Sequence, residues 1–266
     1  LKIPCKLSML VRRDQDRLRR YAHLGTGNYN HTTARFYTDL GLITAEPAIT
    51  AEVAEVFNLL TAHNRETYFE QLLVAPAGLM RGMLDRIERE SEQARAGRPA
   101  AIIAKMNGLM DPAIIKALYR ASQAGVEIDL IVRGICCLRA GMPDISENIR
   151  VYSIIGRFLE HSRIFYFANG GTEEIWLASA DWMNRNLRGR VEVVFPIFNP
   201  GLKQRIYRDL IELAIADRTK SRQRRANGTY TRHTPGPGEE ETEMQERLMR
   251  LALGEDLNLP GTSPSV

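Results

Sequence analysis

The middle of the chain alternates between strand, helix and strand, and this order restricts the fold more than any other feature of the sequence. Residues 101–106 form a run that is apolar except for Lys105, and residues 126–132 form a second run rich in β-branched side chains. A helix signal separates them, because Asp111-Pro112 is a favourable helix start and Gly125 is a typical stop. Two buried strands joined by a helix are typical of a parallel pair. We therefore predict a mixed-sheet α/β fold.

Further strand and helix signals extend this central unit in both directions. Before it lie a short strand and a helix, at residues 72–74 and 78–96. After it lie four strand candidates and a helix, at residues 151–155, 164–167, 175–177, 191–195 and 200–216. The order of these elements suits one large sheet with helices packed against it.

The start of the chain reads as a smaller α/β unit. Two strands are expected at 7–12 and 18–24, joined by a charged turn, and an amphipathic helix is expected at 49–60. A polar connector at 61–69 suggests a domain boundary near residue 70. The first residue is Leu1, at what reads as a strand edge, so we take this first unit to be incomplete and its N-terminal region to be missing.

The last part of the chain has a different composition. It is basic at first, then rich in proline and glycine, and it ends in a short amphipathic stretch. Such composition favours a flexible, non-catalytic tail. The division that we predict is into residues 1–70, residues 71–225 and residues 226–266.

Bulk composition excludes several classes of protein. With 44% hydrophobic and 26% charged residues, the sequence is ordinary for a soluble globular protein. Three cysteines, two of them adjacent, give neither a disulfide framework nor the spacing of metal ligands. No signal sequence or membrane-spanning apolar run is present, so we expect the cytoplasm, with peripheral membrane association left open. The net charge of +4 favours anionic partners.

The segment around His161 carries the strongest chemical signal. In an extended segment, residues two apart point to the same side, so His161 and Arg163 should face one site together. A guanidinium can hold phosphate oxygens, and an imidazole can attack phosphorus or move a proton near neutral pH. A Ser/Asn-containing turn at 179–186 follows. This pattern predicts a site for phosphoryl groups.

A similar layout occurs near the start of the chain. Lys6 precedes a strand, and a Gly/Thr/Asn turn follows at 25–28. Two such half-sites suggest a pseudo-symmetric site between two similar units. Pro4, however, stands where the second half-site has His161.

A third cationic position lies at the end of the central parallel pair. Arg133-Gly134 follows the strand at 126–132, at the carboxyl edge where open α/β sheets bind ligands. We expect Arg133 to contact phosphate.

Five segments together resemble bacterial polyphosphate kinase. Residues 21–30 and 34–39 are similar to signatures of the third domain of that family, and residues 131–134, 160–163 and 179–186 to signatures of its fourth domain. The resemblance runs from Leu1 to about Ala216, and it covers only the C-terminal part of a four-domain chain. It implies two phospholipase D-like mixed-sheet α/β units, the first of them incomplete.

The resemblance also implies an activity, partners and site residues. The family transfers the terminal phosphate of ATP reversibly to inorganic polyphosphate, through a phosphohistidine and with magnesium. It implies ATP or ADP contacts for Tyr37, Arg133 and His161, with His161 also a candidate general acid. Further phosphate or polyphosphate contacts are expected at Lys6, Arg35, Arg163 and Asn184. We expect no metal ligands in this part of the family's chain, no specific nucleic acid, and a homo-oligomer for the full-length protein.

The main departure from the family pattern lies at Pro4. The family places its phosphorylated histidine at this position, and proline has no nucleophilic group. Cys5 is no replacement, since it points to the opposite face of an extended segment. We therefore expect this chain to fold and to bind nucleotide or polyphosphate, but to form no phosphohistidine at position 4. Two alternatives stay open: a phospholipase D-like phosphodiesterase, and a non-catalytic polyanion-binding module.

Overall fold

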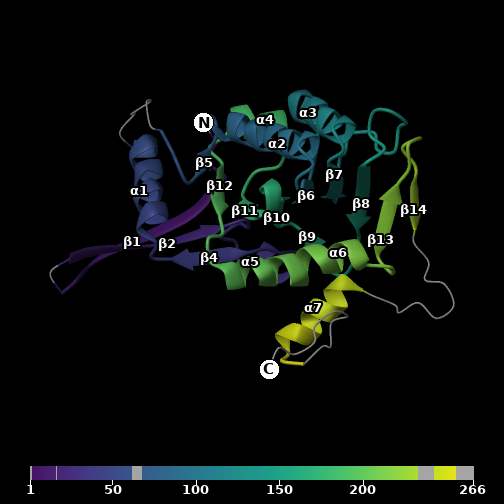
Figure 1. Ribbon diagram of the computed structural model, residues 1–266. Helices are drawn as coiled ribbons and strands as arrows, with labels where there is room; N and C mark the ends of the chain where they lie inside the picture. Colours follow the sequence, from purple (N-terminus) through teal and green to yellow (C-terminus); the bar gives the residue numbers. More distant parts are fainter. Residues whose placement is uncertain (1, 16, 62–67, 233–242, 256–266) are drawn as a thin grey trace, which may run out of the picture.

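The computed structural model describes residues 2–15, 17–61, 68–232 and 243–255. Within these ranges, a nine-stranded mixed sheet forms the centre of the protein (Figure 1). Its strands lie in the order β14-β13-β8-β7-β6-β10-β11-β12-β5. Their bounds are β5 Leu73–Val74, β6 Ala101–Met106, β7 Glu127–Val132, β8 Ile149–Ile154, β10 Arg163–Phe167, β11 Glu174–Ala178, β12 Val193–Pro196, β13 Ser221–Arg224 and β14 Tyr230–Arg232. The predicted mixed-sheet α/β fold is confirmed.

The parallel strands β6, β7 and β8 form the middle of this sheet, as the sequence predicts for the first two. Helix α3 (Pro112–Gln123) connects β6 to β7, and the Asp111 side chain caps it by accepting from the N–H groups of Ala113 and Ile114. Gly125, at φ +93°, ends the connection. Strand β10 lies antiparallel to β6, with Ile164 opposite Lys105. The start of β10 therefore lies beside the carboxyl ends of β6 and β7.

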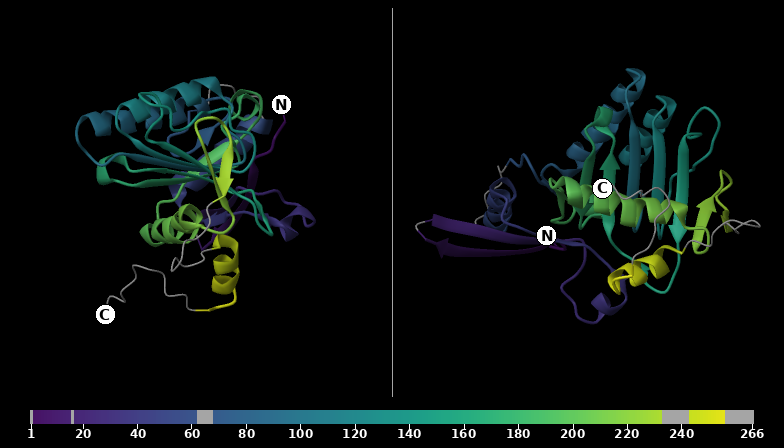
Figure 2. Two further views of the ribbon diagram at one scale, coloured as in Figure 1. Left: turned by 90° about the vertical axis from the view of Figure 1, so that its right-hand side faces the viewer. Right: turned by 60° about the horizontal axis from the view of Figure 1, so that its bottom comes forward.

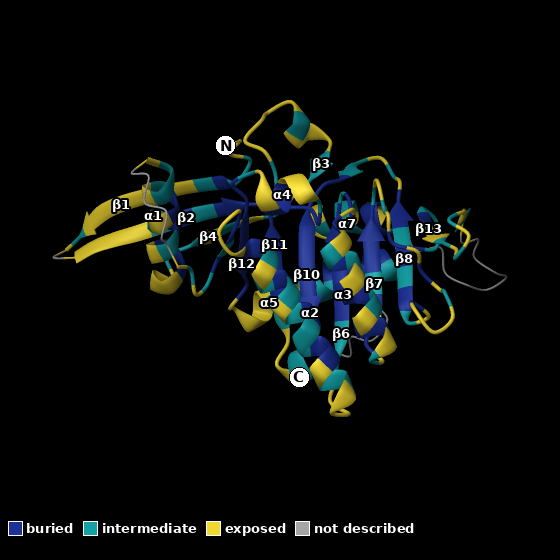
Figure 3. Ribbon diagram, turned by 90° about the horizontal axis from the view of Figure 1, so that it is seen from above, coloured by how far each residue is buried: buried dark blue, intermediate teal, exposed yellow. Residues whose placement is uncertain are grey.

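Helices cover both faces of the sheet (Figure 1). One face carries α2 (Leu79–Arg95), α3 and α4 (Asn184–Arg188), and the other carries α5 (Pro200–Ile206), the π turn η3 (Tyr207–Glu212) and α6 (Leu213–Ala216). The helix predicted at 200–216 is thus helical along its length but widens in the middle. Figure 3 shows that the central strands are buried between these layers.

The first part of the chain forms a small sheet unit. It consists of the antiparallel strands β1 (Lys6–Asp14), β2 (Arg17–Gly25) and β4 (Gly41–Thr44), with α1 (Pro47–Thr61) packed against them. The far end of the β1–β2 hairpin projects away from the rest of the molecule (Figure 2). Near its base, Leu24 and Val53 share one hydrophobic core with Ile164 and Leu177 of the large sheet. The small sheet unit is therefore fixed against the large sheet.

Two further contacts join the small sheet unit to the large one. A short turn, η1 (Thr33–Arg35), leads into β3 (Tyr37–Thr38), which pairs in parallel with β9 (Leu159–Glu160). A second bridge pairs Lys2 with Arg190. Elsewhere, the turn η2 (Asn169–Gly171) joins β10 to β11.

Of the tail predicted at residues 226–266, residues 233–242 and 256–266 lie outside the described residues. Within its described part, β14 adds an edge strand to the large sheet, and α7 (Met244–Ala252) packs its first residues into the protein. Met244 is 1% exposed, and its N–H donates to the buried Asp217 carboxylate. The buried side chains of Met244 and Gln245 and the hydrogen bond to Asp217 therefore hold the start of α7 against the protein. None of the described helices is long and apolar enough to cross a membrane.

Candidate functional site

A pocket of about 420 Å³ opens where β6 and β7 end and β10 begins. Both predicted half-sites contribute to its wall, with Pro4, Lys6 and Asn28 from the first part of the chain and Arg133, His161 and Arg163 from the second. A larger hollow of about 870 Å³ lies beside the β1–β2 hairpin, but none of the predicted site residues lines it. The smaller pocket is therefore the candidate site.

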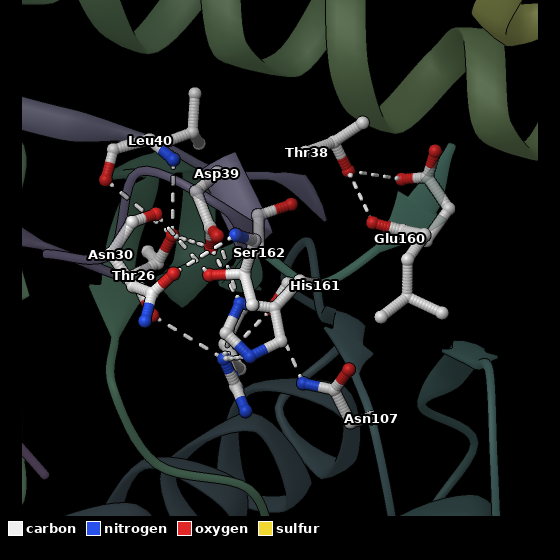
Figure 4. Close-up of polar contacts among 12 residues, drawn as sticks. Thr26, Asn30, Thr38, Asp39, Leu40, Asn107, Glu160, His161 and Ser162 are labelled. Carbon is white, nitrogen blue, oxygen red and sulfur yellow. Dashed lines mark hydrogen bonds and ion pairs between the residues drawn. The ribbon is translucent and has the colours of Figure 1, made fainter. Parts of the chain in front are cut away.

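The imidazole of His161 is held from several sides (Figure 4). Its Nδ1 lies 2.9 Å from both carboxylate oxygens of Asp39, and the ring of Tyr37 lies against it with centroids 4.7 Å apart. Burial lowers the pKa of His161 and nearby Arg163 lowers it further, while the hydrogen bond to Asp39 opposes both. The ring is therefore neutral near pH 7, with its Nδ1–H donating to Asp39.

Arg163 forms a buried fork with Asp181. Its Nε and Nη2 donate to the two Asp181 oxygens at 3.2 and 3.1 Å, and its Nη1 donates to the carbonyls of His161 and Thr26. Nη1 also lies 3.2 Å from Nε2 of His161. Burial alone would raise the pKa of Asp181, but Arg163 holds it below its usual value. This pair fixes a positive charge beside the imidazole.

Lys6 is a buried cation without a direct partner. The residue is only 7% exposed, and among the described residues its ammonium forms no ion pair and no hydrogen bond. Burial lowers its pKa and Arg163 lowers it further, although Glu192 and Asp39 partly compensate. A buried charge of this kind is costly unless an opposite charge approaches it.

Arg133 lies at the carboxyl end of β7, as the sequence predicts. Its Nε donates to Oδ1 of Asn107 at 2.8 Å, and its Nη2 donates to the same oxygen. Asn107 in turn donates from Nδ2 to the His161 carbonyl and to Asp181. The guanidinium is thereby oriented at the pocket wall.

Three of the predicted contacts lie outside the pocket wall. Tyr37 touches the ring of His161 but does not line the pocket. Arg35 is exposed in η1, and Asn184 is exposed at the first residue of α4. The pocket wall therefore includes Lys6, Arg133, His161 and Arg163, whereas Arg35 and Asn184 are not among its lining residues, although Met183 and Arg185 beside Asn184 are.

The two half-sites are built in the same register. We call Pro4, Lys6 and Thr26 the first half-site, and His161, Arg163 and Ser179 the second half-site. Lys6 begins β1 and pairs with Gly25, which precedes Thr26. Arg163 begins β10 and pairs with Ala178, which precedes Ser179. Each cation therefore starts a strand opposite the end of the next one.

Each half-site also pairs a hydroxyl with a carboxylate. Thr26 Oγ1 donates to Asp39 at 2.7 Å and accepts from the N–H of Leu40 at 3.0 Å. Ser179 Oγ donates to Glu192 at 2.5 Å and accepts from the N–H of Val193 at 3.1 Å. Each carboxylate also lies near the other half-site. Asp39, which binds Thr26 of the first half-site, contacts His161, and Glu192, which binds Ser179 of the second, lines the pocket together with Pro4 and Lys6.

Sequence reasoning missed four residues of this site: Asp39, Asn107, Asp181 and Glu192. Two of them had a usable signal, because Asp39 and Glu192 each lie just before a strand that follows a half-site. Asn107 follows β6 as Arg133 follows β7, so parallel-strand ends could have paired them. Asp181 lies within the 179–186 turn but carried no signal of its own.

Two further features of the site concern Cys5 as a candidate nucleophile and the metal-ligating side chains. Burial raises the pKa of the Cys5 thiol to about 11, and Cys5 packs against the hydrophobic core. This raised pKa lowers the thiolate fraction of Cys5 at neutral pH and disfavours it as a nucleophile beside Pro4. No group of three or more metal-ligating side chains occurs among the residues that the structure describes.

Comparison with known proteins gives matches along nearly the whole chain. Residues 1–66 match the family model described as polyphosphate kinase C-terminal domain 1, and residues 72–245 match the model described as polyphosphate kinase C-terminal domain 2. Polyphosphate kinase from Synechocystis sp. is 48% identical over 98% of this chain and 36% of its own length. Polyphosphate kinase from Xylella fastidiosa is 51% identical over 96% of this chain and 36% of its own length. This chain thus spans little more than a third of these relatives.

Solved structures give a similar result. The crystal structure of polyphosphate kinase from Porphyromonas gingivalis matches with a TM-score of 0.89 at 40% identity, over 96% of this chain and 39% of that one. Nuc from Salmonella typhimurium, a phospholipase D family member, matches with a TM-score of 0.43 at 16% identity. The two C-terminal domain matches, which together cover most of this chain, lead to one conclusion: this chain belongs to the polyphosphate kinase family.

Proposed function

We propose that this chain forms the ATP- and polyphosphate-binding part of a polyphosphate kinase, an enzyme that moves the terminal phosphate of ATP reversibly to inorganic polyphosphate. The unpaired ammonium of Lys6 carries this proposal. Lys6 lies buried in a pocket whose wall also includes Arg133 and Arg163. Removing such a charge from water costs on the order of several kcal/mol. A phosphate chain in the pocket supplies the missing negative charge.

The basic side chains have distinct roles in this proposal. Lys6 offers all three donors of its ammonium to phosphate oxygens, since no described residue occupies them. Arg133 presents a guanidinium whose plane Asn107 fixes. Arg163 is already bonded to Asp181, so it acts mainly through its charge and by holding the His161 carbonyl. Phosphoryl transfer depends chiefly on such positioning and electrostatic stabilisation.

His161 is proposed to handle the proton of the leaving oxygen. Without ligand its pKa is lowered, so the ring is neutral near pH 7. The negative charge of a bound triphosphate would raise that pKa, because an opposite charge favours the imidazolium. Asp39 would then stabilise the charged ring through its Nδ1 contact. Nucleotide contact by Tyr37 is part of the same proposal, since Tyr37 lies on the imidazole that faces the pocket.

Pro4 limits what this chain does by itself. It lines the pocket at the position that the family uses for its phosphorylated histidine, and it offers no nucleophile, while the raised pKa of the Cys5 thiol disfavours Cys5 as a substitute. We propose that the chain binds phosphate compounds here but forms no phosphohistidine at position 4.

Magnesium is proposed to enter with ATP rather than to occupy a site of this chain. The described residues contain no group of metal-ligating side chains, and Mg²⁺ in nucleotide sites is held largely by phosphates and water. The division near residue 70, a cytoplasmic location with or without peripheral membrane association, and a homo-oligomeric full-length enzyme without specific nucleic-acid binding are also proposals.

Binding to polyphosphate and ATP tests the proposal. Polyphosphate retention should weaken steeply with added salt, because each neutralised phosphate contributes to the slope. Lys6→Met should weaken binding by about 10- to 100-fold, as expected for loss of a charged hydrogen-bond donor worth roughly 1.5–3 kcal/mol. Lys116→Met, on the exposed side of α3, is the matched control and should leave binding unchanged. Equal weakening in both variants would place binding outside the pocket.

A labelling experiment tests the limit set by Pro4. Incubation with γ-labelled ATP and magnesium should leave no acid-labile label on this chain, whereas acid-labile label at any histidine would contradict the proposal.

A second candidate function, a polyanion-binding module without turnover, is favoured by Pro4 itself. Retention of polyphosphate with no phosphate exchange, even when the upstream domains of a relative are added, would support it. Exchange in that mixture would support the kinase. Release of product from phosphodiester substrates would support the phosphodiesterase instead.

A further inference from the structure

A buried polar cluster lies beside the segment between β9 and β10 that carries His161, and none of its members lines the pocket. We call its three members, Lys105, Glu160 and Gln245, the polar clamp. The Glu160 side chain is 3% exposed, and its Oε2 accepts from Nζ of Lys105 at 2.9 Å and from Oγ1 of Thr38 at 3.2 Å. Burial alone would raise the pKa of Glu160, but Lys105, Gln245 and Thr38 hold it below its usual value. Glu160 therefore stays ionised within the protein.

Gln245 closes this cluster from the C-terminal helix α7. Its Oε1 accepts from the N–H of Phe158 at 2.8 Å, and its Nε2 donates to the carbonyl of Phe158 at 2.9 Å. The same Nε2 donates to Oε1 of Glu160 at 2.6 Å. The carboxamide thus pairs with the backbone as a neighbouring strand would, and it also satisfies the second oxygen of a buried carboxylate.

The polar clamp holds the chain on both sides of His161. Lys105 contacts Glu160, and its Nζ also donates to Oγ of Ser162 at 2.8 Å. The N–H groups of His161 and Ser162 donate to the carbonyl of Thr38 at 3.3 and 2.9 Å. Lys105 and Thr38, which contact the backbone or side chains of His161 and Ser162, both bind Glu160, and Glu160 in turn binds Gln245.

Gly156 provides an independent sign that the Gln245 contact is closely fitted. A Cβ added at Gly156 would collide with the carboxamide of Gln245. The backbone before β9 therefore leaves room for this side chain only because residue 156 has none.

We propose that Gln245 is a positioning residue, through which the docking of α7 sets the place of the His161 imidazole in the pocket. The inference rests on the proposed function for its meaning, since position matters only if His161 serves the reaction. A buried carboxylate that loses one of its donors leaves part of its charge unsatisfied, and such networks then rearrange. Rearrangement of Glu160 moves its neighbour His161 relative to Asp39 and the pocket.

The imidazole can be followed directly by NMR of protein with ¹⁵N- and ¹³C-labelled histidine, assigned with His161→Gln. Charged or titratable groups face it from three segments: Lys6 of β1, Tyr37 and Asp39 at β3, and Arg163 of β10. In the unaltered chain we expect a titration below the ordinary pKa of about 6.5, with the proton of the neutral ring on Nδ1. Displacement of the ring weakens the Asp39 contact that supports the imidazolium, so Gln245→Ala should lower the titration midpoint further and shift part of the neutral ring to the Nε2–H form.

Two further variants make the result specific. Gly156→Ala, which displaces the Gln245 carboxamide without removing it, should shift the His161 signals in the same direction. Glu246→Ala changes the next, exposed residue of α7 and should leave them unchanged. If Gln245→Ala and Gly156→Ala remain folded and both keep the original His161 titration and tautomer, the inference is overturned. Absence of ATP and polyphosphate binding by the unaltered chain would overturn the proposed function instead, and the titration would still decide the role of Gln245.

Discussion

The two half-sites have the same backbone pairing and the same hydroxyl–carboxylate contact, but one has Pro4 where the other has His161. We call the shared pairing and contact the frame. Lys6 and Arg163 begin their strands in the same register, and Thr26 and Ser179 bind their carboxylates in the same way. His161 in the second half-site is matched by Pro4 in the first. The frame therefore forms without a histidine, which shows that backbone pairing and the hydroxyl–carboxylate contacts are sufficient to build it.

The surroundings of the two central positions also differ. His161 follows Glu160, which is buried in the polar clamp, whereas Pro4 follows Ile3, which is 53% exposed. Arg163 is neutralised by Asp181, whereas Lys6 has no direct partner among the described residues. The cation of the second half-site is thus paired with a carboxylate, whereas the cation of the first has only the more distant charges of Glu192 and Asp39 to oppose it.

The largest expected effect separates the two cations. Arg163→Leu leaves Asp181 buried without its cation and should lower the free energy of unfolding by about 3–5 kcal/mol. Lys6→Leu removes a charge that has no partner, so the free energy of unfolding should stay the same or rise. Urea denaturation followed by circular dichroism measures both. Similar losses in the two variants would mean that Lys6 has a partner that the comparison overlooks.

The next effect concerns the only thiol beside Pro4. The pKa of Cys5 is raised to about 11 by burial, compared with an ordinary value of 9.0, and Glu192 contributes. Two pKa units correspond to a roughly 100-fold smaller thiolate fraction at pH 8. Iodoacetamide should therefore modify Cys5 about 100-fold more slowly in the folded protein than in urea.

Mass spectrometry of digested protein reads this rate, with the exposed Cys137 as the internal control. Rapid alkylation of Cys5 in the folded chain would reopen it as a substitute nucleophile and would weaken the contrast between the half-sites.

A smaller effect tests whether the carboxylates are equivalent. Pro4→His should place an imidazole near Glu192, as His161 lies near Asp39. An adjacent carboxylate raises a histidine pKa, so Pro4→His combined with Glu192→Gln should titrate roughly one pKa unit lower than Pro4→His alone. Histidine NMR resolves the new signal. An identical midpoint in both proteins would show that the two half-sites differ in more than Pro4.

Much of this arrangement could be predicted from local sequence, for identifiable reasons. The strand at 101–106, the Asp111 cap and Gly125 are set by interactions within a few residues, and the structure has them there. His161 and Arg163 line the same pocket, as their spacing of two residues predicts, although His161 itself lies between β9 and β10. The predicted pocket residues Lys6 and Arg133 also lie together.

The missed residues act across long distances in sequence. Asp39 contacts His161, and Gln245 contacts Glu160. The residues of each pair are far apart in the sequence and come together only in the folded protein. The ordered α7 was missed for the same reason, because its docking depends on the buried Asp217 and on Gly156 rather than on its own composition. Arg35 and Asn184 were predicted as phosphate contacts. The residues around them in the sequence do not indicate that both are exposed.

The smallest expected effect is a difference between the half-sites in how the free energy of unfolding depends on pH. The folded-state pKa of His161 is lowered by burial and by Arg163, so the unfolded chain takes up its proton first, near pH 6.5. Stability from this group is therefore complete above about pH 6.5 and is lost as pH falls through the lower folded value. The lowered carboxyl pKa values of Glu160 and Asp181 act only at more acid pH. Pro4 does not titrate, so His161→Gln should flatten the stability profile just below about pH 6.5. A slope that survives this substitution in urea unfolding would assign it to another group and remove the electrostatic contrast between the two half-sites.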